Sequence, residues 1–499
     1  MRTSTLFHLD LLFMKFPVGN GLRAVPKNSH PIPERQVGRS RPKNKVKWGA
    51  GNLRIFSALC ALLGLALAGA AEAGPEIETW KTTKGARVLF VAAPDLPMLD
   101  VRLVFDAGSA RDGKRSGLAS LTANMLTEGA GEWNADTVAE RIESVGAELS
   151  ADAARDTATL SLRTLTERSA LDQALETVAK SLSEPRFNKA DFERVRENHL
   201  VALRRDAQDP GTVGSKAIYR QVFGAHPYAA DPAGTLETVS ALRREELVEF
   251  HRRYYVAGNA VVAMVGALSR EQAWDLAERL TAGLNTGESP PELPPVPDLS
   301  DPNLERLSFP STQTHVFAGQ PGMRRLDPDY FPLYVGNHIL GGSGLVSLLM
   351  DEIREKRGLS YSVYSYFWPM SERGPLLLSL QTRNDQAAEA WEVLMDTVRR
   401  FWEQGPTEKE LAAAIKHITG GFPLRIASNS KVVGYLAVIG FYGLPLDYLD
   451  RFSERVSQVR AEQVRDAFRR RIHLDRFATV IVGPRKEQPR KEHMNDAGE

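Results

Sequence analysis

Cysteine is almost absent from this chain, which carries a single one, Cys60, among 499 residues. One cysteine cannot form an intramolecular disulfide, so the sequence excludes a small disulfide-stabilised scaffold. The apolar fraction of 42% and the charged fraction of 25% are instead those of an ordinary globular protein. The length allows two or three domains, each with its own apolar core.

A large net charge of either sign is also missing. The formal charge of the whole chain is +1. Residues 1–73 hold 11 of the 63 Lys and Arg and 3 of the 62 Asp and Glu, which leaves 52 basic and 59 acidic residues and a formal charge of −7 in the rest. Because a nucleic-acid-binding protein is expected to be basic, no nucleic-acid partner is predicted.

No apolar run near the N-terminus is long enough to span a bilayer. Residues 55–67 are apolar but fall short of the ~20 residues that a spanning helix needs. Basic residues such as Arg54 precede this run, and Ala71-Glu72-Ala73 forms a small-x-small cleavage site. These features are typical of a secretory signal peptide, with a membrane anchor as the alternative. We expect cleavage after Ala73, export to the periplasm and no stable membrane span afterwards.

The common helix motifs of zinc peptidases, H-x-x-E-H and H-E-x-x-H, do not occur. Residues 117–126, GLASLTANML, nevertheless follow a strand-like run and a Gly-Ser turn, as a metal-binding helix would. Positions 120, 123 and 124 are spaced i, i+3 and i+4, so they share one helix face. They carry Ser120, Ala123 and Asn124. Serine and alanine cannot replace an imidazole and a general base, and asparagine is a weak zinc ligand.

The chain repeats itself once. Residues 239–266 and 456–483 align without a gap over 28 positions and share 8 residues, including the opening Val-Ser and the closing Val-Gly. Each copy reads as an amphipathic helix followed by a strand that ends in glycine. Asn188 and Thr407 stand at corresponding places and both look like helix N-caps. The ordered set of landmarks predicts two homologous halves.

These landmarks divide the chain into five parts. We expect an N-terminal extension with the signal peptide over 1–73, a first domain over 75–286, a proline-rich linker over 287–302, a second domain over 303–485 and a polar tail over 486–499. Six prolines between residues 287 and 302 favour a stiff, extended linker. Strands and helices alternate irregularly in each half, which predicts the α+β class: two tandem domains, each an antiparallel-rich sheet covered by helices.

With these features, the chain resembles the pitrilysin/insulinase superfamily of zinc metallopeptidases, and within it the branch that includes mitochondrial processing peptidase. The stretch 117–126 is similar to the family's G-L-A-H-x-x-E-H-M-L, and 197–210 is similar to a family helix that ends in acidic residues and proline. The most specific stretch is LGGSG at 340–344 followed by DEIREKRGLSYSVYS at 351–365. The resemblance implies two domains that face each other across a peptide-binding groove.

The departures from the family pattern fall on its catalytic positions. The first histidine falls on Ser120, the general-base glutamate on Ala123, the second histidine on Asn124, and the third ligand, a glutamate, on Val201 or its neighbour Ala202. All four catalytic positions are therefore changed, which leaves neither a zinc ligand set nor a base to activate water. We expect no metal or other cofactor on this chain and no activity of the chain alone.

A second family feature is retained. Arg354 and Tyr361 stand seven residues apart, as an arginine and a tyrosine do in the family, where the resemblance implies that they reach substrate beside the zinc. A guanidinium and a phenol are donors that can stabilise charge on a scissile carbonyl. The corresponding positions of the first half, Ile142 and Leu149, cannot do this. The alternative is that Arg354 is a surface residue paired with a nearby acid and that Tyr361 packs in the core.

The pattern predicts a non-catalytic, substrate-binding subunit of a heterodimeric zinc endopeptidase that cleaves unfolded peptides. The resemblance implies that the partner is a homologous, zinc-bearing subunit, to whose active site Arg354 and Tyr361 contribute. The alternative function is that of an inactive structural or scaffold homologue in a larger complex.

Overall fold

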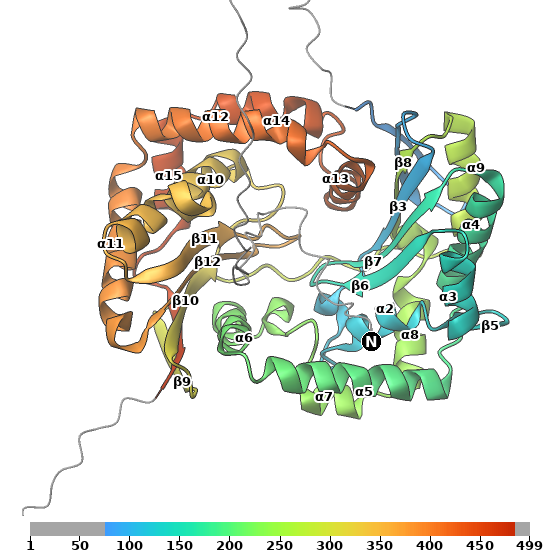
Figure 1. The fold of residues 1–499 in the computed structure, drawn as a ribbon, viewed down its shortest axis with the longest axis horizontal. Coiled ribbons are helices and arrows are strands. Elements are labelled where there is room, and N and C mark those ends of the chain that lie inside the picture. The colour runs from blue at the N-terminus through green and yellow to red at the C-terminus, as the bar shows by residue number, and fades with distance from the viewer. Residues whose placement is uncertain (1–74, 485–499) are drawn as a thin grey trace, which may run out of the picture. The chain divides into compact units, whose positions relative to one another are not determined.

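Two mixed β-sheets, one built from each half of the sequence, form the framework of the protein (Figure 1). The computed structural model describes residues 75–484. The predicted signal peptide with its cleavage after Ala73, the single Cys60 and the tail 486–499 lie outside these residues. Among residues 75–484, no helix combines the length and the apolarity needed to cross a bilayer.

The first sheet has six strands. They are β1 (Glu78–Lys81), β2 (Arg87–Ala92), β3 (Met98–Phe105), β6 (Glu148–Ala153), β7 (Ala158–Leu165) and β8 (Ala260–Gly266). Their order across the sheet is β1-β2-β8-β3-β7-β6. Neighbours run antiparallel except β2 and β8, which are parallel. A separate two-stranded ribbon consists of β4 (Gly129–Ala130) and β5 (Trp133–Asn134).

The second sheet repeats this topology. Its strands are β9 (Asn303–Ser308), β10 (Gln313–Pro321), β11 (Ser360–Phe367), β12 (Pro375–Arg383) and β13 (Ala478–Gly483), in the order β11-β12-β10-β13-β9. Here too one pair, β13 and β9, is parallel. The orders β2-β8-β3-β7-β6 and β9-β13-β10-β12-β11 correspond strand for strand. The internal repeat therefore reflects two halves of the same fold, and β8 and β13 are the strands that end its two copies.

The helices of the first half are α2 (Leu118–Met125), α3 (Ala135–Glu143), α4 (Arg168–Ser183), α5 (Lys189–Asp206), α6 (Pro210–Phe223), α7 (Leu236–Ala241), α8 (Arg244–Tyr254) and α9 (Arg270–Thr281). Those of the second half are α10 (Tyr330–Asn337), α11 (Ala387–Gln404), α12 (Glu408–Arg425), α13 (Asn429–Tyr442), α14 (Tyr448–Ser457) and α15 (Ala461–Arg471). Two π-helical segments, η4 (His338–Gly342) and η6 (Met350–Glu355), follow α10.

Both predicted N-caps are present. The Asn188 side chain accepts a hydrogen bond from the Ala190 N–H at the start of α5. Thr407 forms a reciprocal capping box with Glu410 at the start of α12. Each cap satisfies backbone donors that have no partner within the first helical turn.

The two halves exchange one helix each, which the tandem-domain prediction did not include. Helix α6, from the first half, packs on β10 and β13 of the second sheet, and α13, from the second half, packs on β8, β3 and β2 of the first sheet. The exchange is visible in Figure 1, where the green α6 lies beside the yellow β10, and α13 lies beside β8 and the blue β3. Each sheet thus needs the other half of the chain to bury one of its faces.

A glycine allows each exchanged helix to approach its sheet closely. A Cβ atom at Gly214 of α6 would overlap the Phe317 ring, and one at Gly440 of α13 would overlap the Val261 side chain. In contrast, a Cβ atom at Gly420 of α12 would meet no atom within 4 Å. The two crossings therefore depend on the missing side chain.

We expect Gly214→Ala and Gly440→Ala each to lower the free energy of unfolding by about 1–3 kcal/mol, because overpacking outweighs the gain in helix propensity. Gly420→Ala is the matched control and should raise it by up to about 1 kcal/mol. Denaturant unfolding of the three variants measures this difference. Equal changes in the free energy of unfolding at all three positions would show that the close approach of α6 and α13 to the sheets does not contribute to stability.

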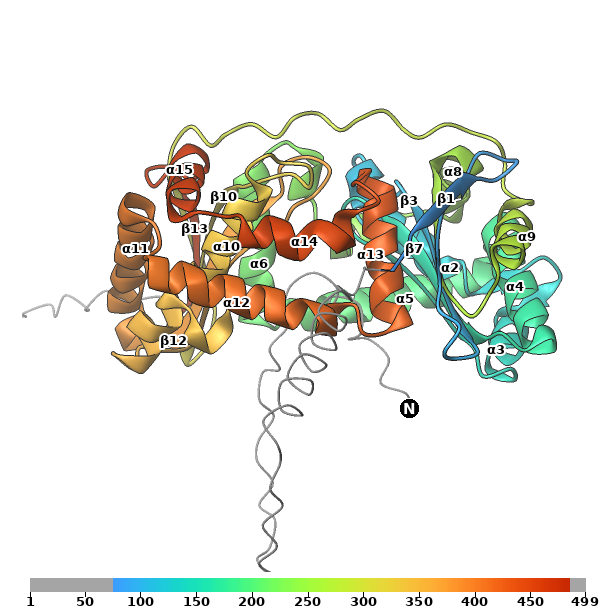
Figure 2. The same ribbon diagram turned by 90° about the horizontal axis from the view of Figure 1, so that it is seen from above.

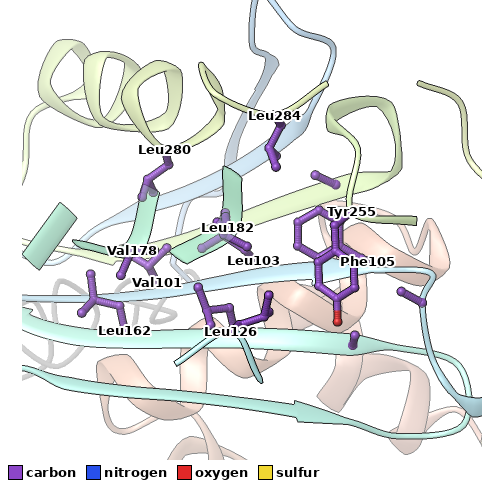
Figure 3. Packing of buried hydrophobic residues seen from close by; sticks show 14 of the residues in the cluster. Val101, Leu103, Phe105, Leu126, Leu162, Val178, Leu182, Tyr255, Leu280 and Leu284 are labelled. Carbon is purple, nitrogen blue, oxygen red and sulfur yellow. The ribbon is translucent and has the colours of Figure 1, made fainter. Parts of the chain in front are cut away.

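The larger apolar core lies between the first sheet and its own helices (Figure 3). Strand β3 supplies Val101, Leu103 and Phe105 at alternate positions of one face. The Phe105 ring packs at 4.9 Å from the Tyr255 ring. Leu182 of α4 and Leu280 of α9 pack in the same core, on the helix side of the sheet (Figure 3). The residues between these three in β3 point to the opposite face of the sheet, which α13 covers.

A histidine is built into this core. His251 of α8 donates from Nε2 to the Leu182 carbonyl at 2.9 Å, and its ring stacks on Tyr255. Burial lowers the pKa of His251 to about 4. The unfolded chain, with a pKa of about 6.5, therefore binds the proton first as the pH falls. The folded state loses stability between pH 6.5 and 4 on this account.

Between pH 7 and pH 5 we expect the wild type to lose about 2 kcal/mol more unfolding free energy than His251→Gln, which keeps a donor for Leu182 but does not titrate. Comparison with the variant removes the contributions of all other groups. Denaturant unfolding at the two pH values gives the difference. The same pH dependence for both proteins would contradict a buried neutral imidazole.

The linker is extended, as its prolines predict. No helix or strand occurs between Thr281 and Asn303, and the segment runs as a drawn-out trace from α9 to β9 (Figure 2). Side chains from both halves hold it: Arg111 donates to the Pro291 carbonyl, His226 to the Pro294 carbonyl and Arg373 to the Val296 carbonyl. The linker is therefore attached to the protein along its length.

Candidate functional site

The helix that carries the zinc-motif positions is fixed at its start. Gly117, the N-cap of α2, has φ 98°, and a Cβ atom there would lie 2.9 Å from the Val239 side chain. The buried Asp112 carboxylate accepts from the Gly117 and Ala119 N–H groups at 2.9 and 2.8 Å. Burial raises the pKa of Asp112 to about 7. Local structure thus fixes the start of α2, the helix that carries three of the predicted zinc-motif positions.

The predicted zinc-motif positions lie on two helices that pack together, α2 and α5. Ser120 and Asn124 are half-buried, and Ala123 is buried. Val201 of α5 is 55% exposed. These side chains offer one hydroxyl, one amide and two apolar groups, which do not fit a Zn²⁺ site. Within residues 75–484, no group of three or more His, Cys, Asp and Glu side chains is placed to hold a metal ion.

The polar residues of α5 have structural partners. Glu197 pairs with Arg204 at 2.9 Å on the surface, and His199 donates to the Ala233 carbonyl at 2.7 Å. Both side chains therefore have structural uses.

Arg354 and Tyr361 are in contact. The guanidinium carbon of Arg354, in η6, lies 4.9 Å from the centroid of the Tyr361 ring in β11, within cation–π range. Tyr361 is 72% exposed, so the alternative of a core tyrosine is wrong. Arg354 also lies 3.6 Å from Glu355, a long contact of a kind that contributes little at the surface.

Backbone geometry aids the exposure of Tyr361. Strand β11 is an edge strand, and its register with β12 shifts between Ser360 and Ser362. A bulge of this kind bends the strand and re-aims the side chain at the irregularity. At the corresponding places of the first half, Ile142 is buried in α3 and Leu149 is half-buried in β6. The exposed pair is therefore particular to the second half.

A buried polar cluster that the sequence did not reveal joins the two halves. Asp156, in the turn between β6 and β7, accepts from the Tyr228 hydroxyl at 2.5 Å, the Tyr442 hydroxyl at 3.0 Å and the Ser371 N–H at 2.8 Å. The Glu372 N–H donates to the Tyr228 oxygen. Burial raises the pKa of the Tyr228 and Tyr442 hydroxyls, so both remain protonated donors.

Comparison with known proteins shows the family. Residues 87–234 match the model described as insulinase (peptidase family M16), and residues 241–418 match the model described as the peptidase M16 inactive domain. The chain belongs to the M16 peptidase family.

Three proteins of known sequence or structure are similar to this chain over most of its length. The crystal structure of a peptidase M16 inactive domain from Pseudomonas fluorescens has a TM-score of 0.79 and 37% identity, over 82% of this chain and 98% of that one. A protein of Helicobacter pylori named non-peptidase homolog YmxG is 27% identical over 79% of this chain and 90% of its own length. An uncharacterized zinc protease of Mycobacterium leprae is also 27% identical, over 82% and 92%.

These findings confirm the family resemblance and the two-domain mixed α/β fold. The chain is an M16 homologue, and the positions predicted to match the four catalytic ones of the family carry Ser120, Ala123, Asn124 and Val201. The predicted inactivity agrees with the description of the matched inactive domain and with the name of the Helicobacter relative. Pairing with a zinc-bearing subunit stays a prediction.

Proposed function

We propose that this chain is the non-catalytic, substrate-binding subunit of a heterodimeric zinc endopeptidase that cleaves unfolded peptides. The zinc ion and the general base belong to a homologous partner subunit, and this chain carries no cofactor of its own. It acts after export to the periplasm, in line with the signal-like residues 54–73. Its part in the reaction is to bind the peptide and to supply donors from Arg354 and Tyr361.

The observation that carries the proposal is the exposed contact between Arg354 and Tyr361. A tyrosine ring that is 72% exposed gains little from folding. The contact holds the Arg354 guanidinium of η6 beside the Tyr361 phenol of edge strand β11, and both groups still have donors that can face a ligand. The two groups can donate hydrogen bonds to a peptide carbonyl and stabilise negative charge that develops on its oxygen.

The strand that carries Tyr361 also supports peptide binding. Edge strand β11 pairs with β12 on one side, which leaves main-chain donors and acceptors on the other side for an additional strand. An extended peptide can use such groups for affinity with little dependence on its sequence. Unfolded chains, unlike folded ones, can adopt this conformation without losing structure.

A mixing experiment tests the proposal. The purified chain is combined with a zinc-bearing M16 homologue from the same organism, and hydrolysis of an unstructured peptide is compared with that of each protein alone. We expect hydrolysis by the mixture to exceed the sum of the two separate rates. If addition of this chain leaves the rate of the zinc-bearing homologue unchanged, the subunit role is wrong, and the scaffold role becomes the better explanation.

A further inference from the structure

A polar cavity of about 610 Å³ lies between the two halves, beside the attached linker. Its walls come from β1 and β2, the residues after β10, the turn before β12, the end of α13 and the linker residues Ser289, Pro290, Glu292 and Leu293. The volume is in the range of pockets that hold small molecules. None of the zinc-motif positions lines it, nor do Arg354 and Tyr361.

The charges in the walls do not balance. Five cationic residues and three acidic residues line the cavity: Lys81, Arg87, Arg111, Arg324 and Arg325, and Asp106, Glu292 and Glu372. Asp106 and Arg111 neutralise each other in a two-point pair with distances of 2.7 and 2.6 Å. The other four cations form no ion pair with a carboxylate of residues 75–484. Four cations therefore face two carboxylates, an excess of two positive charges.

One of these four cations, Arg325, is buried, which makes the excess positive charge energetically unfavourable. Its side chain is buried, with 6% exposure, and its Nε has no hydrogen-bond partner among the described residues. Its Nη groups donate to the Pro369 carbonyl at 3.3 Å and, weakly, to the Tyr330 hydroxyl at 3.5 Å. Neither acceptor carries a charge. The Tyr442 ring, with its centroid 5.2 Å from the guanidinium carbon, attracts the cation but carries no full charge. A buried cation without a counter-ion is unfavourable, and its field extends into the cavity because the surroundings screen it poorly.

Arg324 and Lys81 complete the site. Both are exposed, and the hydrogen bonds and ion pairs of the described part of the chain involve neither side chain. They can therefore turn to a ligand without breaking an existing contact. Arg87, in contrast, donates to the Gly440 carbonyl at the end of α13 at 3.2 Å, so part of its hydrogen-bonding capacity has a structural use.

We propose that this cavity binds a small, multiply charged oxyanion, with Arg324 and Lys81 as its direct contacts and Arg325 as the buried charge behind them. Guanidinium groups match the oxygen spacing of phosphate and carboxylate groups, so either group supplies the required chemistry. Because both halves and the linker contribute walls, the bound anion would stabilise their present arrangement by mass action. This role is independent of the proposed peptidase partnership.

Titration of the isolated full chain tests the proposal with inorganic pyrophosphate in one arm and citrate in the other. Calorimetry measures affinity, and thermal unfolding measures stabilisation. We expect saturable binding of one anion per chain with a Kd below about 1 mM, weakened by added salt. Tighter binding of pyrophosphate identifies a phosphate-bearing ligand, and tighter binding of citrate identifies a carboxylate-bearing one.

The double variant Lys81→Gln/Arg324→Gln should weaken binding at least about tenfold, because two direct charged contacts are lost. Both positions are exposed, so the variant should unfold at the wild-type temperature when no anion is present. Arg168→Gln is the control, since Arg168 is 96% exposed and does not line the cavity. Absence of saturable binding to both probes up to about 10 mM, or equal binding by wild type and double variant, would overturn the proposal.

Discussion

Arg354→Ala should lower the rate of peptide hydrolysis by the mixed complex about 10²–10³-fold, the usual effect of removing one donor that stabilises a developing oxyanion. The loss should appear mainly in kcat, because the interaction is strongest when the carbonyl oxygen becomes negative. Arg354 makes one long contact with Glu355 and one with the exposed Tyr361 ring. The free energy of unfolding should therefore change by less than about 1 kcal/mol.

Two further variants make this prediction specific. Tyr361→Phe keeps the ring under the guanidinium and removes only the hydroxyl, so a fall in kcat would assign a role to the phenol itself. Arg399→Ala removes an arginine of α11 that pairs with Asp396 at the surface, and should leave the rate unchanged. Unchanged kcat and KM in Arg354→Ala would contradict the assigned role, while an effect on KM alone would limit Arg354 to binding.

Asp156→Ala should lower the free energy of unfolding by about 3–5 kcal/mol, the largest loss of stability that we expect from a single substitution here. The change leaves two tyrosine hydroxyls and the Ser371 N–H without their acceptor, and each unsatisfied buried donor costs about 1–3 kcal/mol. The lost hydrogen bonds include one between the two halves, because Tyr442 belongs to the second half and Asp156 to the first.

Denaturant unfolding measures the loss, and Asp385→Ala is the matched control. Asp385 pairs with Arg383, and both side chains are more than 60% exposed, so its removal should cost less than about 1 kcal/mol. Tyr442→Phe removes one of the three hydrogen bonds and should cost about 1 kcal/mol. A cost for Asp156→Ala no larger than that for Asp385→Ala would show that the cluster does not hold the halves together.

Local sequence patterns predicted several elements well. The strand-like run that precedes residues 117–126 corresponds to β3, and the capping residues Asn188 and Thr407 begin α5 and α12. The internal repeat predicted two sheets of equal topology because each copy carries its own strand signal. The Arg354–Tyr361 pair could be identified for a related reason, since its two members are close in sequence and match a family spacing.

The exchange of α6 and α13 could not be predicted in this way. An apolar helix face indicates that a helix packs on something, but it does not indicate which of two similar sheets it covers. The Asp156 cluster was missed because its partners, Tyr228, Ser371 and Tyr442, are distant in sequence and have no motif. The Gly214 and Gly440 crossings were the available signal, because a glycine inside a helix often marks a close approach.

We infer that this chain keeps the fold of a zinc peptidase without its metal site. Metal analysis of the purified chain, combined with a peptide hydrolysis assay of the same sample, tests this inference. We expect far less than one zinc per chain and no hydrolysis above background. One zinc per chain, together with hydrolysis that needs no second polypeptide, would contradict it.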